Sequence, residues 1–319
     1  MMSELIPSFD WQRVVVAPWT TEFSIFGWIM LMGFLVTAAC GLVGNYLLLR
    51  RLALMGDAVS HSVLPGLVIA FLLSQSRSTG AMFLGALVAG VFATVVIELI
   101  HTKSRVKQDA AMGIAFSTLF AIGVVLTVVF ADQVDLDAEC VLYGEIAFVP
   151  LEPMITVGGW TLGPESLVRM GAVLLGVVVL IVAFYKELLV CAFDAGLARS
   201  LGVNPTVAHF ALMGALSIVV VSAFESVGAI LVIAMLILPG ATASLLSQRL
   251  PVVHVLSVAH AALSAVLGVH LGVWLECSLG AAMVVAGAFL FGVVWFIAPE
   301  SGLIAQWRRQ HRRPTESAN

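Results

Sequence analysis

Long apolar runs separated by short polar stretches make up most of this 319-residue chain. The runs hold about 20 residues each, the length that an α-helix needs to cross roughly 30 Å of hydrocarbon. We therefore expect an all-α fold, a polytopic bundle of about nine transmembrane helices, with a re-entrant or interfacial segment allowed within 139–156. The expected spans are 24–49, 53–74, 80–100, 111–131, 167–187, 207–224, 227–247, 252–273 and 278–298.

The composition excludes a soluble globular protein. Hydrophobic residues account for 61% of the chain and charged residues for 11%, and the mean hydropathy is +1.09. An ordinary globular domain is about half apolar and about a quarter charged. The cysteines form no CxxC pair, so neither a zinc cluster nor a disulfide framework is indicated, and we expect them to be packing residues. They are Cys40, Cys140, Cys191 and Cys277.

The distribution of Lys and Arg predicts the orientation of the bundle. Three of these residues, Arg13, Arg77 and Arg169, fall on one side of the expected spans. The others fall on the opposite side: Arg50, Arg51, Lys103, Arg105, Lys107, Lys186, Arg199, Arg249, Arg308, Arg309, Arg312 and Arg313. Cytoplasmic loops carry the excess of Lys and Arg, so we expect the N-terminus outside and the C-terminus in the cytoplasm.

This orientation divides the chain into three parts. Residues 1–23 form an extracytoplasmic segment, residues 24–300 the transmembrane domain, and residues 301–319 a basic cytoplasmic tail suited to anionic lipid. The outer loop after the fourth span is acidic, which would attract a cation, although acidic residues also collect outside simply because they translocate easily. Its acidic residues are Asp132, Asp135, Asp137, Glu139, Glu145, Glu152 and Glu165.

The second expected span contains an ionisable pair. Asp57 and His61 lie four residues apart, on one face of a helix. An ionisable side chain inside the bilayer costs roughly 2.5 to 3.5 kcal/mol on insertion scales, so it usually faces a partner or a water-lined pathway. Carboxylate oxygen and imidazole nitrogen together suit manganese, iron or zinc ions. The pair alone also fits a structural role, in which Asp57 bonds a neighbouring helix and His61 is a satisfied core histidine.

Two prolines predict interruptions of the spans. Pro65 and Pro239 are each followed by a glycine within an apolar run. A proline removes a backbone donor and bends a helix, which frees carbonyl groups that can line a cavity near the midplane. Two such helix breaks are typical of a transporter pathway, although a channel or an exchanger would also fit.

Two carboxylates are expected at the outer ends of helices. Glu225 lies in a tight hairpin and Glu276 follows the eighth span. They are candidates for an outer gate or entry site, and interfacial helix caps are the alternative. His254, His260 and His270 share one span, but their spacing does not place them on one stripe, so we interpret them as packing residues.

One cytoplasmic connection is more than a turn. Residues 186–205 predict a short amphipathic helix with Leu188, Phe193, Leu197 and Leu201 as its apolar positions, ending at Gly202. Such a helix at the inner face of the membrane is suited to docking another protein. A linker helix resting on the bilayer surface is the alternative.

The sequence is similar to the membrane permeases of bacterial ABC importers for manganese, zinc and iron. The resemblance covers roughly 24–300, and five stretches carry it in the same order along the chain. These stretches are 53–66, 109–126, 135–151, 186–202 and 225–246.

The resemblance implies a protein of the bacterial plasma membrane with several partners: a second permease copy or paralogue, cytoplasmic ATP-binding subunits and an extracytoplasmic metal-binding lipoprotein. It implies that Asp57 and His61 are pathway ligands of the transported ion. Around Glu276 the chain departs from the family, whose members often follow the acidic residue with Pro-Ser-Gly-Ala, so the resemblance does not support an entry role there. The residues implied to couple the permease to the ATPase are Asp194, Ala198, Arg199 and Gly202.

We therefore expect the permease subunit of an ATP-driven importer of divalent transition-metal ions, with manganese favoured over zinc or iron because 135–151 most resembles the manganese and iron branch. The chain has no GxxxxGKS/T phosphate loop, so we expect it not to be an enzyme, and ATP hydrolysis is expected in a partner chain. Neither a permanently bound cofactor nor a nucleic-acid partner is expected. The alternative is a proton-coupled secondary metal transporter with Asp57 as the proton carrier. An intramembrane enzyme has little support, because no Ser/His dyad or HExxH motif occurs.

Overall fold

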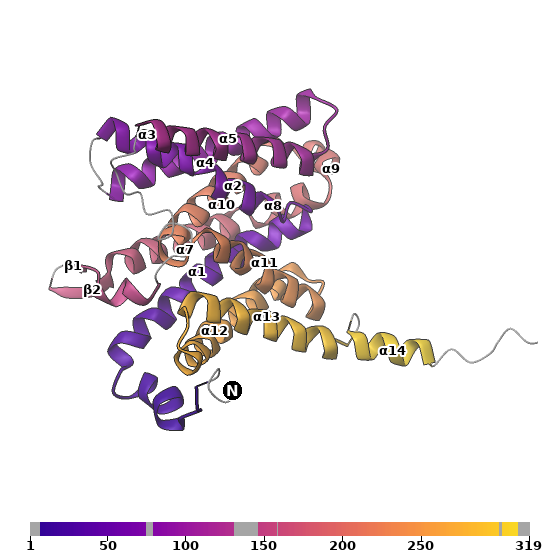
Figure 1. The fold of residues 1–319 in the computed structure, drawn as a ribbon. Coiled ribbons are helices and arrows are strands. Elements are labelled where there is room, and N and C mark those ends of the chain that lie inside the picture. Colours follow the sequence, from indigo (N-terminus) through magenta and orange to yellow (C-terminus); the bar gives the residue numbers. More distant parts are fainter. Residues whose placement is uncertain (1–6, 75–78, 131–145, 158, 300–301, 312–319) are drawn as a thin grey trace, which may run out of the picture.

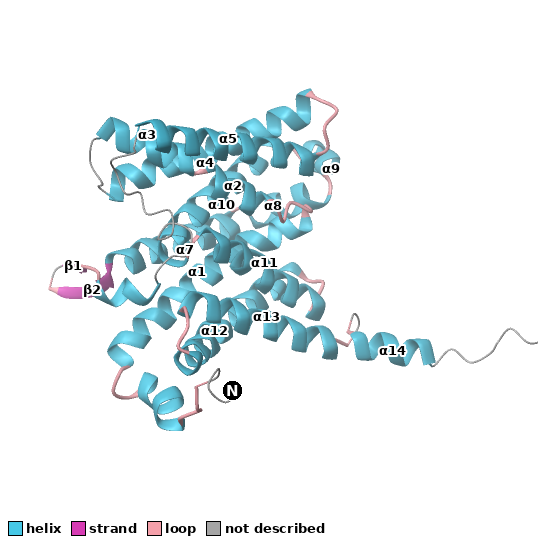
Figure 2. Cartoon of the chain, viewed as in Figure 1, coloured by secondary structure: helices cyan, strands magenta, loops and turns pink. Residues whose placement is uncertain are grey.

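The computed structural model describes residues 7–74, 79–130, 146–157, 159–299 and 302–311. Within these residues, eight helical segments are long and apolar enough to cross a membrane, and a shorter apolar helix accompanies them. Every expected span coincides with helix, which confirms the all-α transmembrane bundle (Figure 1; Figure 2). The helices in the expected spans are α1 (Phe23–Leu49), α2 (Met55–Ser62), α3 (Leu64–Ser74), α4 (Thr79–Lys103), α5 (Gln108–Phe130), α7 (Glu165–Ala183), α10 (Pro205–Val227), α11 (Ala229–Leu246), α12 (Leu250–Leu275) and α13 (Leu279–Ile297).

Short elements lie at the ends of the long helices. The segment η4 (Ile146–Leu151) falls in the range expected to be re-entrant or interfacial, and its Ile146 and Val149 are buried. It is a 3₁₀ helix packed against α1 and not a further span. An antiparallel hairpin of β1 (Met154–Val157) and β2 (Trp160–Pro164) was not expected, because its strands are too short for a clear alternation of apolar and polar residues. The short elements are η2 (Gln12–Val16), η3 (Ala17–Trp19), η4 (Ile146–Leu151), β1 (Met154–Val157), β2 (Trp160–Pro164), α8 (Tyr185–Phe193), α9 (Ala195–Ser200) and α14 (Leu303–His311).

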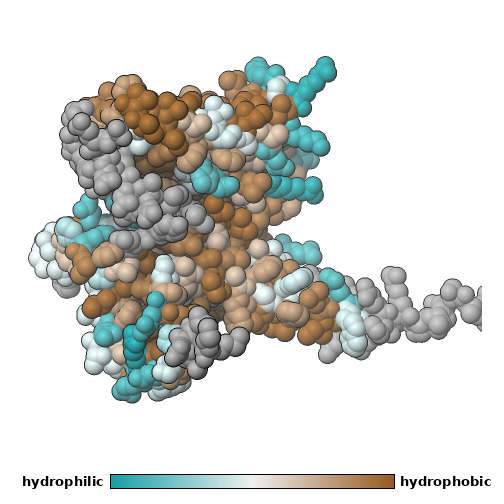
Figure 3. Space-filling model, in the orientation of Figure 1, coloured by the Kyte–Doolittle hydropathy of each residue, from teal (hydrophilic) through white to brown (hydrophobic). Residues whose placement is uncertain are grey.

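The long helices form three groups in space. In Figure 1, α3, α4 and α5 lie at the top, α12 and α13 at the bottom, and α1, α10 and α11 between them. Apolar side chains cover much of the surface around the helices, while hydrophilic residues gather near α9 at one end and near the N-terminal segment at the other (Figure 3). This arrangement is that of a bundle surrounded by lipid, with polar groups at its two ends.

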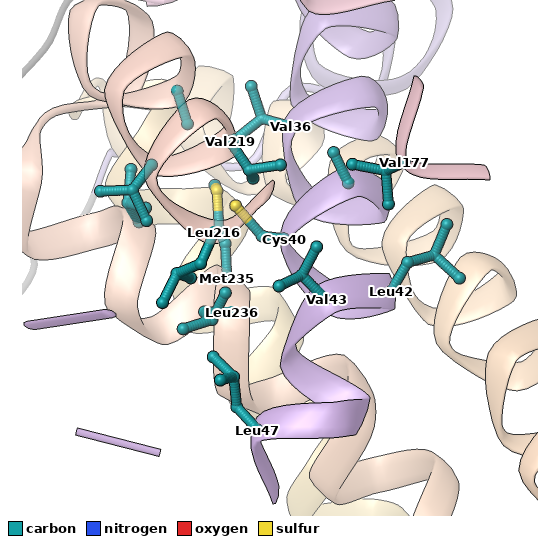
Figure 4. Packing of buried hydrophobic residues seen from close by; sticks show 14 of the residues in the cluster. Val36, Cys40, Leu42, Val43, Leu47, Val177, Leu216, Val219, Met235 and Leu236 are labelled. Carbon is teal, nitrogen blue, oxygen red and sulfur yellow. The ribbon is translucent and has the colours of Figure 1, made fainter. Parts of the chain in front are cut away.

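Helix α1 supplies the centre of the hydrophobic core. Its Cys40 and Val43 point toward Leu216 of α10 and Met235 and Leu236 of α11 (Figure 4). All five side chains are buried. Since lipid is as apolar as these side chains, tight packing rather than escape from water holds such helices together.

Small residues allow α1 and α11 to approach closely. A Cβ atom added to Gly44 would lie 2.0 Å from the carbonyl oxygen of Leu236, and one added to Gly41 would lie 2.9 Å from Cβ of Pro239. Neither position can therefore carry a larger residue without moving a helix backbone. Close approach through small residues is a common way to join helices in a membrane.

The two predicted helix breaks have different outcomes. The second span is divided between α2 and α3 at Val63, and Pro65 lies in the first turn of α3, where its missing N–H removes no helical hydrogen bond. The break expected at Pro239 was wrong, because α11 is one continuous helix through this residue. Neighbouring helices can stabilise a proline inside a membrane helix, and here α1 packs on its ring.

Several predictions lie outside the described residues. These concern most of the acidic outer loop, Cys140, Arg77 and residues 312–319 of the basic tail. Within the tail, residues 303–311 form α14. The orientation of the bundle in the membrane stays a prediction.

We predict that Gly44→Ala destabilises the bundle. The added methyl group would overlap the backbone of α11, and overpacking of this kind typically costs about 1–3 kcal/mol. Thermal unfolding in detergent measures the loss. Gly176→Ala in α7 is the control, since a Cβ atom there would meet nothing within 4 Å. Equal melting temperatures for the two variants would contradict the close approach of α1 and α11.

We predict that Cys277 is labelled from outside the cell. Its side chain is exposed in the turn between α12 and α13, which the predicted orientation places outside. A membrane-impermeant maleimide, applied to intact spheroplasts that express the Cys140→Ser chain, should react at this position. Cys277→Ser should abolish the labelling. Labelling that appears only after permeabilisation would reverse the predicted orientation.

Candidate functional site

A tight turn after α1 determines where α2 begins. The amide of Leu52 donates to the carbonyl of Leu47 at 2.8 Å, and that of Arg51 donates to Leu48 at 3.1 Å. This pair of bonds is a Schellman motif, and Arg51 has the left-handed conformation, with φ of 60°, that glycine usually provides. Helix α2 then starts at Met55 and packs closely on α11, because Gly56 leaves room for Leu236.

Asp57 and His61 are brought together on α2, as the sequence predicts. Nε2 of His61 lies 3.1 Å from Oδ1 of Asp57. The imidazole ring also packs against two rings of α5, with centroids 5.8 Å away for Phe116 and 5.9 Å away for Phe120. Asp57 lies in the first turn of α2 and His61 in its last turn. The pair is a preformed oxygen and nitrogen donor set against an aromatic wall.

The pair is only partly covered by its own chain. The side chains of His61 and Asp57 retain 30% and 31% of their exposure. Among the described residues, no three His, Cys, Asp or Glu side chains are grouped so that they could hold a metal ion. Asp57 and His61 are therefore a pair of candidate ligands without a third such side chain beside them in the described part of the chain.

The two candidate gate residues each form an ion pair. Glu225 lies in the last turn of α10, not in a hairpin loop, and it pairs with Arg169 of α7. The guanidinium of Arg169 also lies over the ring of Phe83, 5.8 Å from its centroid. Glu276 accepts a hydrogen bond from Arg13 at 2.8 Å. The gate role of both carboxylates stays a prediction, and a cation that bound either of them would compete with an arginine.

The N-terminal segment is fastened to the end of α12, which the sequence did not predict. His270 bonds the carbonyl of Val14 through Nδ1 at 2.7 Å and accepts from Nε1 of Trp19 at 3.1 Å. The indole of Trp274 donates to the carbonyl of Pro7 at 3.1 Å. Since Val14 offers only an acceptor and Trp19 only a donor, the His270 ring carries its proton on Nδ1. His270 thus has a structural contact within the chain.

The remaining histidines of α12 are also part of the packing. One nitrogen of the His254 ring lies 2.8 Å from Nδ2 of Asn45, whose Oδ1 accepts from Ser257 at 3.1 Å. His260 is only 5% exposed, and its two ring nitrogens have no hydrogen-bond partner among the described residues. Neither histidine belongs to a cluster with other metal-binding side chains in that part of the chain.

The expected amphipathic helix between α7 and α10 is divided in two. Asp194 has extended backbone angles and ends α8, and its carboxylate caps α9 by accepting from the amides of Gly196 and Leu197 at 2.8 and 3.1 Å. Gly202, with φ of 80°, ends α9 in a second Schellman motif. The expectation of one helix was wrong because a capping aspartate inside the segment starts a new one.

The helices α8 and α9 pack one side against the rest of the chain and expose the other. Ala198 is fully buried, so within this chain it packs α9 onto its neighbours, whereas Arg199 is exposed. The exposed apolar side chains are Phe193, Leu197 and Leu201, with 71%, 51% and 62% of their surface accessible. Three such side chains together with an exposed arginine make a surface suited to a protein partner.

A polar cluster behind α8 was missed by the sequence analysis. Nη2 of Arg50 donates to the carbonyl of Cys191 in α8 at 3.2 Å, and Nη1 lies 3.2 Å from Nδ1 of His209 in α10. Nε2 of His209 lies 3.4 Å from Oε2 of Glu98 in α4. Burial lowers the pKa of the Arg50 guanidinium, while nearby Cys191 and Glu98 oppose this shift. The guanidinium stays charged at neutral pH, because its ordinary pKa is so high.

Comparison with known proteins gives a consistent result. The chain is 41% identical over 291 residues to the manganese transport system membrane protein MntD of Bacillus subtilis (strain 168), which covers 91% of this chain and 98% of that protein. It is 41% identical over 276 residues to the zinc transport system membrane protein TroD of Treponema pallidum (strain Nichols), covering 86% of this chain and 75% of that protein.

A solved structure, PsaBC from Streptococcus pneumoniae in complex with Fab, matches with a TM-score of 0.74 and 30% identity, covering 98% of this chain and 100% of that chain. The family model described as the ABC 3 transport family matches residues 22–298. The helical bundle, the relatives and the family model agree, and this chain belongs to the ABC 3 transport family.

Proposed function

We propose that this chain is the permease subunit of an ATP-driven importer of divalent transition-metal ions. The observation that carries the proposal is the Asp57–His61 pair, which places an oxygen and a nitrogen donor 3.1 Å apart inside a segment apolar enough to span a membrane. Relatives that match most of the chain are named as membrane proteins of manganese and zinc transport systems.

The exposure of the pair supports a pathway role over a structural one. A carboxylate and an imidazole that are about 30% exposed cannot face hydrocarbon without a large desolvation cost. They must face water, an ion or another protein. A second permease copy, placed against α2 and α5, would cover the pair and bring two more ligands, Asp57 and His61 of that copy. Four donors would then surround one ion in the pathway.

We favour manganese as the transported ion, followed by zinc and iron. A carboxylate and an imidazole accept all three ions, and an unconstrained site of this kind binds zinc more tightly than manganese. Selection of manganese therefore needs a further component. We propose an extracytoplasmic metal-binding lipoprotein that delivers the ion to the outer ends of the helices, where Glu225 and Glu276 are the candidate gate.

We propose that α8 and α9 dock on a cytoplasmic ATP-binding subunit. Exposed apolar side chains lie next to the exposed Arg199 at this end of the bundle. They are Phe193, Leu197 and Leu201, and a surface of this kind favours contact with a protein over contact with water. The chain has no phosphate loop of its own. Hydrolysis of ATP in the partner would move α8 and α9, and Asp194 and Gly202 would keep the docked helix intact.

We predict that Asp57→Asn and His61→Gln each reduce metal uptake at least about tenfold, the scale of a lost metal-binding contact. Both changes keep side-chain volume but weaken a ligand. Uptake of radiolabelled manganese and zinc is measured in cells that also carry the ATPase and the lipoprotein, at equal membrane levels of the permease.

Glu22→Gln is the matched control, because Glu22 is an exposed carboxylate outside the spans. Near-normal uptake of both metals by both variants would mean that the pair is structural. A proton ionophore added while ATP is maintained distinguishes the two energy sources, and loss of wild-type uptake under these conditions would instead indicate coupling to a proton gradient.

We predict that Phe193→Ala combined with Leu197→Ala reduces the amount of ATPase subunit that purifies with the permease by about tenfold or more. We place both side chains at the centre of the interface, where truncation of an anchor residue costs more than about 1 kcal/mol. Phe9→Ala serves as the control, since Phe9 is a similarly exposed aromatic residue in the N-terminal segment. Unchanged recovery of the ATPase would exclude α8–α9 as the main docking surface.

A further inference from the structure

Arg50 joins three helices at the end of the bundle that carries α8 and α9. Arg50 directly follows the last residue of α1. Its guanidinium donates to the carbonyl of Cys191 in α8 and lies 3.2 Å from Nδ1 of His209 in α10. The far nitrogen of that ring lies 3.4 Å from Glu98 in α4. The side chains of His209 and Glu98 are only 14% and 29% exposed. This cluster was not predicted from any sequence motif.

The chemistry of the cluster determines its protonation. A guanidinium can only donate, so Nδ1 of His209 must accept from Arg50 when the ring is neutral. The ring proton is then on Nε2, which lies 3.4 Å from the carboxylate of Glu98 without a hydrogen bond of good geometry, so this link is mainly electrostatic. A positive group, a neutral bridge and a negative group follow one another across three helices. The order leaves no like charges in contact.

Two of the helices joined by the cluster also pack against α2, the helix that carries the candidate metal ligands. Both α10 and α4 pack against α2, and α10 packs against α8. The cluster therefore connects α8, part of the proposed ATPase dock, with helices that pack on the one carrying Asp57 and His61. Charged hydrogen bonds in a partly desolvated place are costly to leave unmade, so α8 and α10 cannot separate easily while Arg50 bonds both.

We propose that Arg50, His209 and Glu98 form a positioning joint that transmits displacement of α8 and α9 to α10 and α4, and through them to α2. The inference rests on the proposed function, because it takes the ATPase to act on α8 and α9. The three residues do not touch the transported ion. They act by holding α8 to α10 and α4, so that these helices move together when the ATPase displaces α8 and α9.

The test compares transport with ATP hydrolysis in the full complex reconstituted in proteoliposomes. Arg50→Lys keeps the charge but loses the planar fork that reaches His209 and Cys191 together. His209→Asn keeps an acceptor near the Nδ1 position but no longer reaches Glu98. We expect the number of metal ions carried per ATP hydrolysed to fall about fivefold or more in both variants, within the range of measured coupling energies. ATPase rate and subunit assembly should stay within about twofold of the wild type.

Arg249→Lys is the matched control, because Arg249 is an exposed arginine at the same end of the bundle. An unchanged ratio of transport to hydrolysis in Arg50→Lys and His209→Asn would overturn the proposal. A fall in transport that only parallels lost assembly would also overturn it, since a merely structural role predicts that result.

A second measurement does not depend on metal transport. Leu64→Cys, at the junction of α2 and α3, is introduced into a chain with Cys140→Ser and Cys277→Ser, and its maleimide labelling rate is followed with and without ATP. We expect ATP to change this rate in the parent complex and not in the Arg50→Lys complex. An ATP effect of equal size in both would overturn the joint. An ATP effect that is present in the wild-type complex and absent in the Arg50→Lys complex, without metal transport by either, would overturn the proposed substrate and leave the joint supported.

Discussion

Pairing of ionisable groups is the constraint on which this bundle depends. In an apolar bundle a charge without a partner costs several kcal/mol, so such groups are placed where another helix supplies one. Arg169 holds Glu225 across two helices, and Arg13 holds Glu276 at the end of α12. Each pair fixes the position of one helix end relative to another segment. The polar contacts thus add fixed points at the helix ends to the close apolar packing in the centre of the bundle.

Asp57 and His61 differ from the other pairs in where their partners come from. Each is the polar partner of the other on the same helix, and the pair reaches another helix through apolar contact, where the His61 ring packs on Phe116 and Phe120 of α5. Their exposure is also unusual for a segment that spans a membrane. About one third of each side chain is left uncovered by its own chain, which leaves the two donor atoms accessible as the proposed pathway role requires.

The sequence predicted the spans well because the apolar runs are a local property of the chain, and the Asp57–His61 contact followed from helical spacing alone. It could not predict contacts between helices. Arg50 and His209 are separated by 159 positions, and no periodicity links them. Local features failed in two places: Pro239 was expected to break α11 because the support from α1 is not visible in sequence, and the cap at Asp194 was overlooked within an amphipathic pattern.

The left-handed turn at Arg51 makes the length of one loop critical. Its two hydrogen bonds fix the end of α1, and α2 begins only a few residues later with Asp57 in its first turn. Because only two residues separate Leu52 from Met55, one residue inserted or deleted there would displace the start of α2 and move Asp57 and His61 relative to their neighbours. Substitutions in this connection can be neutral, but changes in its length cannot, and natural variants should preserve the spacing even where they alter the residues.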